Sequence, residues 1–255
     1  MPRFFVRQEQ IKDGFVTLLG DDAHHVSRSL RMAAGERITV CDMQKKEYEC
    51  ELTEFLSDSV RARILSTREG DTEPPYFARV FQALPKGDKL DSIIQKAVEC
   101  GACELVTFES ERCIARVKDG AEEKKLERRQ RIALEAAKQS GRGTLPKVLA
   151  TVDFNEAIRR AAKESDIALF CYEGDGTLPL PSVLKEYKAQ ENAKPNPVIS
   201  VVVGSEGGFS QAEAQKAREA GLRLVGLGKR ILRTETAASF VLSCLVYEWE
   251  LLRNE

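Results

Sequence analysis

Hydrophobic and polar residues alternate in short runs along the first part of the chain. The clearest run extends from Tyr48 to Leu52, where apolar side chains take turns with glutamates. A period of two predicts half-buried β-strands, which we expect at residues 4–7, 15–19, 37–42, 48–55 and 60–65. One helix-like segment, residues 22–32, interrupts them. Closely spaced short strands are typical of a small β-barrel.

Beyond residue 75 the pattern changes to apolar runs that alternate with segments of helical period. Residues 66–75 contain Thr, Gly, Asp and two prolines and are interpreted as a linker. We expect strands at 80–84, 105–108, 148–151, 167–172, 198–203 and 222–227, and helices at 88–100, 121–140, 154–163, 181–189, 211–220 and 235–252. This alternation predicts an α/β domain with a largely parallel sheet covered by helices on both faces. The predicted domains are residues 1–70 and 76–255.

The last predicted helix carries apolar residues at steps of three and four, which indicates one continuous buried stripe. The stripe consists of Ala238, Val241, Leu242, Leu245, Val246, Trp249 and Leu252.

Two glycine-containing loops near the C-terminus, residues 204–210 and 227–237, each follow a predicted strand and open a predicted helix. Open α/β sheets bind ligands at the carboxyl ends of their strands, and glycine lets the backbone approach a ligand closely. The first loop lacks the spacing of a P-loop or of a dinucleotide-binding fingerprint, and Glu206 would repel a phosphate. A neutral or cationic ligand fits better. The alternative is a strand-to-helix turn without a ligand.

Composition describes an ordinary globular protein of 255 residues, 42% hydrophobic and 31% charged. The net charge of −1 argues against a generic, charge-driven nucleic-acid binder but leaves room for local basic patches. We interpret Arg128, Arg129 and Arg131 as a solvated helix face.

Seven cysteines in a chain of this length favour reduced thiols in a reducing compartment. Cys100 and Cys103 have a suggestive spacing, but a zinc site would need a second pair or nearby histidines, so we predict buried small side chains and no metal. The N-terminus lacks the apolar stretch of a signal peptide, and no run has the length of a membrane span. We therefore expect a cytoplasmic protein.

Four blocks of sequence, taken together, resemble the 16S rRNA uridine N3-methyltransferases of the SPOUT superfamily over nearly the full chain. The blocks are His24 to Arg31 with Gly35, Lys86 to Lys89 with Gln95 to Ala97, Glu135 to Arg142 with Pro146, and the two C-terminal loops. The loops are the most specific block, because Gly-x-Glu-Gly-Gly-Phe precedes Leu-Gly-x-Arg-Ile-Leu-Arg-x-Glu-Thr-Ala.

The resemblance implies a PUA-like barrel that helps to bind RNA, and a SPOUT methyltransferase domain with a deep trefoil knot. It also implies a homodimer with active sites at the subunit interface, acting on 16S rRNA in the small ribosomal subunit. S-adenosylmethionine would lie in the two glycine loops, closed by the loop after residues 167–172. The implied cofactor-binding residues are Gly204, Ser205, Glu206, Gly207, Gly208, Leu227, Gly228, Ile231, Leu232 and Tyr172.

Methylation of uridine N3 requires loss of the N3 proton and stabilisation of the charge that spreads onto O2 and O4. Arginine suits that task because it stays protonated and donates in a planar fork. We assign it to Arg233 and Arg142, with Glu206 and Glu235 as candidates for accepting the proton. For Glu235 the alternative is a first-turn acid favoured by the helix dipole.

The implied RNA-binding residues are Arg28, Arg31, Lys86, Lys89 and Arg142, which would contact phosphates and position the RNA. For His24 and His25 we favour packing or RNA contact over catalysis.

The chain departs from the family pattern in three places. Ser205 replaces a usual proline, Cys100 replaces a leucine, and residues 43–46 replace a glycine-containing hairpin turn. None of these changes removes a reactive group. Two other functions stay open: an RNA 2′-O-ribose methyltransferase of the same fold, and a non-catalytic RNA-binding or ribosome-assembly protein.

Overall fold

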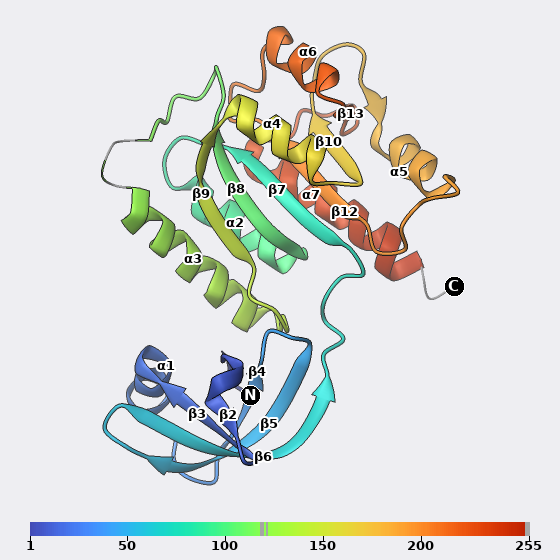
Figure 1. Ribbon diagram of the computed structural model, residues 1–255. Helices are drawn as coiled ribbons and strands as arrows, with labels where there is room; N and C mark the ends of the chain where they lie inside the picture. The colour runs from blue at the N-terminus through green and yellow to red at the C-terminus, as the bar shows by residue number, and fades with distance from the viewer. Residues whose placement is uncertain (118–119, 121, 253–255) are drawn as a thin grey trace. The chain divides into compact units, whose positions relative to one another are not determined.

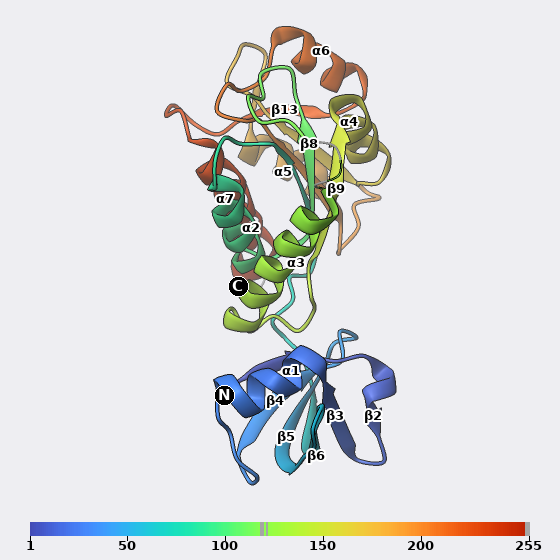
Figure 2. The ribbon, with the colours of Figure 1, turned by 90° about the vertical axis from the view of Figure 1, so that its left-hand side faces the viewer.

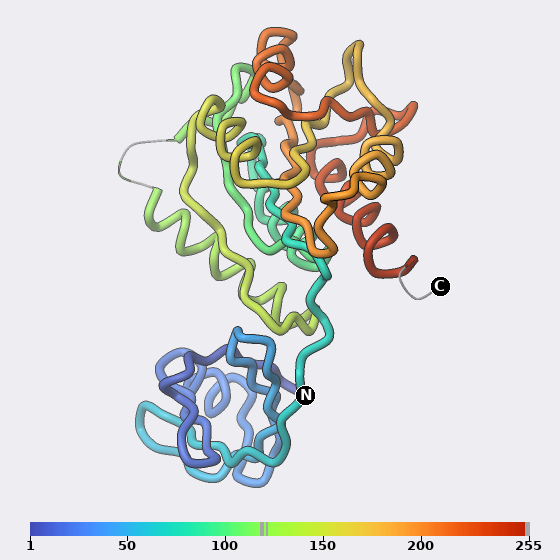
Figure 3. The backbone as a smooth tube through the Cα atoms, turned by 45° about the vertical axis from the view of Figure 1, so that its right-hand side comes forward, coloured from blue at the N-terminus to red at the C-terminus, as the bar shows by residue number. Residues whose placement is uncertain are grey.

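The computed structural model describes residues 1–117, 120 and 122–252 (Figure 1). Its chain forms two compact units, the first built from Met1–Glu73 with Ala137–Leu145 and the second from Pro74–Ala136 with Pro146–Glu255. Figure 3 traces the chain, which passes from one unit to the other after residues 73, 136 and 145. The inclusion of residues 137–145 in the first unit is not predicted from the sequence.

A mixed, curled sheet of six strands forms the first unit, in the order β1-β4-β5-β6-β3-β2. Its strands are β1 (Arg3–Phe5), β2 (Ile11–Lys12), β3 (Phe15–Leu19), β4 (Arg37–Cys41), β5 (Lys46–Phe55) and β6 (Ser59–Glu69), with a 3-10 turn η1 (Gln8–Gln10) before β2. Strand β1 is parallel to β4 and the other pairs are antiparallel. Within the described residues the edge strands β1 and β2 do not pair, so the expected barrel is a half-barrel.

The inward side chains of this sheet make one apolar core, which includes Val16, Leu18, Ile38 and Leu52. A short helix α1 (Gly20–His24) continues as the π-helical turn η2 (His25–Ser29) and adds Ala23 and Val26 to the core. Alternate side chains of the strands thus lie in this core, together with one apolar face of the helix, which gives the curled sheet a single core.

Two predictions for this unit are wrong in detail. The predicted linker begins too early, because Ser66 to Glu69 extend β6 and pair with β5 from Glu49 back to Lys46. The predicted helix 22–32 runs too far, because Arg31 lies in the left-handed region at φ 51°, which helices do not tolerate.

Seven strands form the sheet of the second unit, all parallel, in the order β11-β13-β10-β12-β7-β8-β9. They are β7 (Phe77–Ala83), β8 (Ala102–Glu109), β9 (Lys147–Asp153), β10 (Ile167–Cys171), β11 (Leu178–Pro179), β12 (Val198–Val203) and β13 (Arg223–Gly226). The predicted parallel α/β sheet is confirmed, while the short strand β11 carries too few residues to give a pattern.

The helices are α2 (Lys89–Glu99), α3 (Glu122–Gln139), α4 (Phe154–Lys163), α5 (Leu180–Lys188), α6 (Gln211–Glu219) and α7 (Thr234–Val246), followed by the π-helical turn η3 (Tyr247–Leu251). Figure 2 shows α2 and α7 on one side of the parallel sheet and α4 on the other. The predicted start of α3 at Ala121 lies outside the described residues.

The predicted apolar stripe of the last helix packs mainly inside its own unit, where α7 contacts α2, β12 and β7. Ala238, Val241, Leu242, Leu245 and Trp249 are buried, Val246 is half-buried, and Leu252 is exposed. The trefoil knot implied by the resemblance stays a prediction. Across the part of the chain that the structure describes, no helix combines the length and apolarity needed to cross a membrane.

Candidate active site

A pocket of about 720 Å³ lies at the carboxyl ends of β10, β12 and β13, entirely within the second unit. The loops that follow these strands line it, as the rule for open α/β sheets requires. All ten residues implied as cofactor contacts are among its lining residues, namely Tyr172, Gly204, Ser205, Glu206, Gly207, Gly208, Leu227, Gly228, Ile231 and Leu232.

The first glycine loop is held in a tight turn between β12 and α6. Gly208 lies at φ 61°, and its N–H donates to the Ser205 carbonyl across 3.0 Å. A Cβ on Gly204 would come within 3.1 Å of the Gly208 Cα, so both positions favour glycine. Helix α6 then begins in a capping box, where the Ser210 hydroxyl accepts from the Glu213 N–H.

The second glycine loop turns at Gly228, which lies at φ 104°. Among the described residues, no heavy atom lies within 4 Å of a Cβ placed there, so the substituent would project into open space in a pocket-lining loop. A side chain at 228 would therefore be disfavoured by the positive φ and not by a collision.

Gln82, fully buried at the end of β7, ties the two loops together. Its side-chain amide donates to the carbonyls of Gly204 and Ala83, at 3.2 and 3.0 Å, and to the Thr234 hydroxyl at 2.9 Å. The Thr234 hydroxyl in turn donates to the Gly204 carbonyl at 2.7 Å. The start of the first loop and the start of α7 thus share one buried polar cluster.

Glu206 joins the first loop to the turn after β7. Its carboxylate accepts from the Lys86 backbone N–H at 3.1 Å and from Lys89 Nζ at 2.7 Å. Burial raises the pKa of Glu206, but hydrogen bonds from Lys89 and backbone N–H groups outweigh burial and leave that pKa below its usual value. A carboxylate held in its charged form is a weak proton acceptor.

Glu235 differs from Glu206, because its Oε2 is buried and has no hydrogen-bond partner within the described part of the chain. Its nearest cation is Arg233, at 3.9 Å, whose own side chain is 83% exposed. Both residues line the pocket at the start of α7. Among the described residues, Glu235 thus has one buried oxygen without a partner, and the exposed Arg233 guanidinium has only the long contact with Glu235.

The loop after β10 adds Cys171, Tyr172 and Gly174 to the pocket. Burial raises the pKa of the Cys171 thiol to about 12, so this thiol is neutral near pH 7 and does not serve as a thiolate nucleophile. The Tyr172 ring lies so close to Gly174 that a Cβ there would collide with it.

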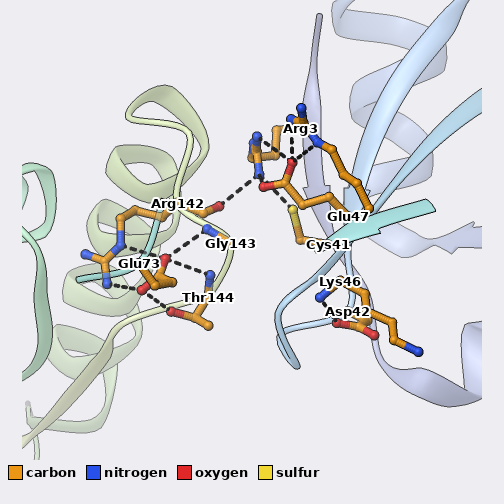
Figure 4. A network of polar contacts seen from close by, with 10 residues as sticks. Arg3, Cys41, Asp42, Lys46, Glu47, Glu73, Arg142, Gly143 and Thr144 are labelled. Atoms are coloured by element: carbon orange, nitrogen blue, oxygen red, sulfur yellow. Dashed lines mark hydrogen bonds and ion pairs between the residues drawn. The ribbon is translucent and has the colours of Figure 1, made fainter. Parts of the chain in front are cut away.

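Arg142 lies in the first unit, outside the residues that line the pocket (Figure 4). Its guanidinium is 4% exposed and donates through Nε and NH2 to both oxygens of Glu73, at 2.9 and 2.7 Å. Glu73 also accepts from Gly143 N–H and from the backbone and hydroxyl of Thr144. Burial raises the pKa of Glu73, and the hydrogen bonds from Arg142 and Thr144 reverse that effect and lower it.

Figure 4 also shows a second ion cluster beside this one, centred on the buried carboxylate of Glu47. Arg3 and Arg68 donate to Glu47 at 2.6 and 2.8 Å, and Arg3 NH1 also donates to the Arg142 carbonyl at 3.2 Å. The two clusters hold residues 137–145 in the first unit.

The residues expected to contact RNA are divided between the units. Arg28 and Arg31 are exposed in the first unit, and Lys89 lines the pocket in the second. His25 makes an edge-on ring contact with Phe4 at 6.2 Å, which fits the packing role. Cys100 and Cys103 are partly exposed rather than buried.

Sequence reasoning missed Arg112, Gln82 and Thr234. The sequence gives a weak signal for two of them, because Gln82 is a polar residue at the end of an apolar strand and Thr234 is a polar residue at the start of a helix. Arg112 lies in a loop without hydrophobic periodicity, and the sequence gives no signal for it.

Two family models match the chain: "RNA methyltransferase domain" over residues 72–246 and "RNA methyltransferase PUA domain" over residues 18–65. The chain is 33% identical to the ribosomal RNA small subunit methyltransferase E of Bacillus subtilis (strain 168) over 259 residues, with all of both chains covered. It is also 33% identical to the Synechocystis protein of that name over 241 residues, with 94% of this chain and 76% of the relative covered.

Solved structures give the same picture. The Neisseria gonorrhoeae ribosomal RNA small subunit methyltransferase E bound to S-adenosyl methionine has a TM-score of 0.83 at 32% identity, with 98% of each chain covered. A putative methyltransferase of Legionella pneumophila in complex with the bound cofactor SAM has a TM-score of 0.83 at 27% identity, with 96% of this chain and 97% of that chain covered.

Proposed function

We propose that this chain, which belongs to the ribosomal RNA small subunit methyltransferase E family, methylates N3 of a uridine in 16S rRNA. It is a small-subunit rRNA methyltransferase that uses S-adenosylmethionine. What we propose beyond this is the target base, uridine, and the methylated atom, N3. The observation that supports it is one pocket in which both glycine loops meet Glu235, whose Oε2 has no partner among the described residues, and the exposed guanidinium of Arg233.

The pocket residues fit S-adenosylmethionine. A volume of about 720 Å³ is within the range of small-molecule sites, and glycine at 204, 208 and 228 exposes backbone groups to a ligand. The carboxylates of Glu206 and Glu235 suit a ligand with a sulfonium cation. When bound, the cofactor supplies an electrophilic methyl group.

Glu235 is the best candidate to accept the N3 proton. Its Oε2 needs a hydrogen-bond donor, and an imide N–H is one. Glu206 is a weaker candidate, because Lys86 and Lys89 already engage its carboxylate. We therefore give Glu206 the role of fixing the Lys89 side chain at the rim of the pocket, where it can meet an RNA phosphate.

Arg233 is our candidate for stabilising the charge on O2 and O4. Its side chain is free to swing toward a bound base, since the 3.9 Å contact with Glu235 is weak. Arg142 stays a prediction for this step and for RNA contact, but its guanidinium would first have to leave Glu73.

We further propose a cytoplasmic homodimer that acts on 16S rRNA in the small ribosomal subunit. Phe240, Tyr247 and Leu251 share an exposed face of the last helix, opposite to the buried stripe. The family resemblance implies a homodimer, and we assign the second copy of the chain to this face. Light scattering that reports a monomer at micromolar concentration would count against it.

Nucleoside mass spectrometry of 16S rRNA incubated with the protein and S-adenosylmethionine tests the activity. N3-methyluridine is the expected product. A 2′-O-methylated nucleoside would indicate the ribose reaction instead, and a protein without affinity for the cofactor would indicate a non-catalytic role.

Arg233→Ala should lower turnover by about 100-fold or more, as expected for loss of one charge-stabilising group, while cofactor affinity changes little. Arg233→Lys should restore little, because an ammonium does not reproduce the planar fork. Glu235→Gln should also lower turnover, because an amide does not take up the N3 proton. A parental rate in Arg233→Ala would remove Arg233 from the reaction.

A further inference from the structure

Arg112 follows β8 in a short segment that is fastened to the first glycine loop and to α6. The Glu111 N–H donates to the Glu213 carboxylate at 2.8 Å, and the Ser210 hydroxyl donates to the Glu111 carboxylate at 2.7 Å. These bonds fix the backbone on which Arg112 stands.

The Arg112 side chain itself lies against Gly207. A Cβ on Gly207 would come within 2.9 Å of the Arg112 Cβ and 3.2 Å of its carbonyl oxygen, so glycine at 207 lets the two segments lie this close together. Arg112 NH1 donates to the Gly207 carbonyl at 3.1 Å. The Ser205 hydroxyl, at the position where the family usually has proline, also reaches the Arg112 carbonyl at 3.5 Å.

The guanidinium of Arg112 has most of its donors unused. Among the described residues its side chain makes this one hydrogen bond, although a guanidinium carries several N–H donors. The acids around it are engaged, Glu111 by Ser210 and Glu206 by Lys89. Arg112 also lines the pocket. An exposed cation with one hydrogen bond among the described residues therefore stands at the first glycine loop.

Arg116, four positions further along, shows the contrast. Its guanidinium donates to the carbonyls of Ser110 and Glu111, at 3.0 and 3.2 Å, and lies 3.3 Å from the Glu109 carboxylate. It does not line the pocket at the glycine loops. Arg116 thus behaves as a structural arginine of the same segment.

We infer that Arg112 is a further substrate-binding residue, whose guanidinium contacts an anionic oxygen of the target nucleotide beside the cofactor loop. The inference rests on the proposed function. The oxygen belongs either to the uracil ring, where charge develops when N3 loses its proton, or to the adjoining phosphate. Both are acceptors that match an arginine fork.

Preorganisation distinguishes Arg112 from Arg233. Both side chains are exposed, but Arg112 is held to Gly207 by a 3.1 Å hydrogen bond, whereas Arg233 has only the 3.9 Å contact with Glu235 among the described residues. Donors that are already fixed cost no reorganisation when charge develops. The two arginines can therefore have different roles: Arg112 binds the nucleotide, and Arg233 moves toward the base when it is bound.

The test compares Arg112→Met and Arg112→Lys with the parental protein and with Arg116→Met as the matched control. Each protein is titrated with S-adenosylmethionine in a calorimeter, and its kcat and KM are measured on 16S rRNA at several salt concentrations. Methionine and lysine keep the stem that packs on Gly207, so the loop stays in place.

Arg112→Met should lower kcat/KM by about 100-fold without weakening cofactor binding, and Arg116→Met should match the parental protein. A phosphate contact would appear as a raised KM and a salt slope that is smaller by about 0.7–0.9, with partial rescue by lysine. A uracil contact would appear as a lowered kcat without rescue by lysine.

Two results would overturn the inference. One is a parental kcat/KM in Arg112→Met, and the other is a loss of cofactor affinity that parallels the loss of turnover, which would assign Arg112 to the cofactor or to the loop. If the parental protein itself makes no N3-methyluridine, the proposed function fails. If the parental protein makes it and Arg112→Met makes it equally fast, only the role of Arg112 fails.

Discussion

Replacing Thr234 by valine tests how strongly the two glycine loops depend on each other. The Thr234 hydroxyl accepts from Gln82 and donates to the Gly204 carbonyl, at 2.9 and 2.7 Å, and the residue is buried. Valine has nearly the same shape and removes only the hydroxyl. The change therefore cuts the link between α7 and the first loop without opening a cavity.

The expected loss follows from the contacts that remain. The Gln82 amide keeps the carbonyls of Ala83 and Gly204 as acceptors, so no buried donor is left without a partner. Two lost hydrogen bonds at about 1 kcal/mol each give a decrease of about 2 kcal/mol in the free energy of unfolding. For a unit of this size that is about 4–8 °C in Tm.

Denaturant unfolding measures the loss, and calorimetry measures the affinity for S-adenosylmethionine. Affinity should fall by no more than about 30-fold, the factor that 2 kcal/mol represents. Thr236→Val is the matched control, because Thr236 is exposed two positions further along the same helix and should change stability by less than about 0.5 kcal/mol. Equal losses in the two variants would refute the link between the loops.

Three further outcomes are expected. Gly228→Val should abolish S-adenosylmethionine binding in calorimetry while unfolding stays cooperative, because a branched side chain at φ 104° would strain the loop and enter the pocket. Glu73→Gln should lower the free energy of unfolding by about 3 kcal/mol at pH 7. Because the pKa of Glu73 is lowered in the folded protein, its stabilisation is complete above the unfolded value of about 4.3 and is lost as pH falls through the folded value. The denaturation curves of the parental protein and of Glu73→Gln should therefore converge in acid. Lys45→Gly should raise the free energy of unfolding by about 0.5–1 kcal/mol, because Lys45 lies at φ 70°, whereas Lys46→Gly in the adjoining strand should not.

The alternation of apolar runs and helical periods was sufficient to predict most of the second unit. The bounds of β12 and α4 agree with the predicted segments 198–203 and 154–163 to the residue. Both elements have burial patterns that follow directly from their own sequence, since β12 is apolar at every position except Ser200 and α4 has one apolar face. The bounds of an element can thus be predicted from the sequence where its burial follows from its own hydrophobic pattern.

Of the candidate site, the sequence predicted the residues that lie in the two glycine loops, 204–210 and 227–237. The loops line the pocket because the carboxyl ends of parallel strands meet at one edge of the sheet. Arg142 was assigned to catalysis from resemblance, but its partner Glu73 is 69 positions away and nothing local indicates the pair. Arg112 reaches the pocket only through tertiary packing on Gly207.

The membership of residues 137–145 in the first unit limits how the gene can be divided. A fragment that ends at Glu73 would keep that carboxylate and lose the guanidinium that neutralises it. A fragment that starts at Pro74 would carry Arg142 without its counter-charge. No single break between codons yields both units intact, so deletion mapping would score each fragment as defective, and recombination could not exchange the first unit as one uninterrupted segment.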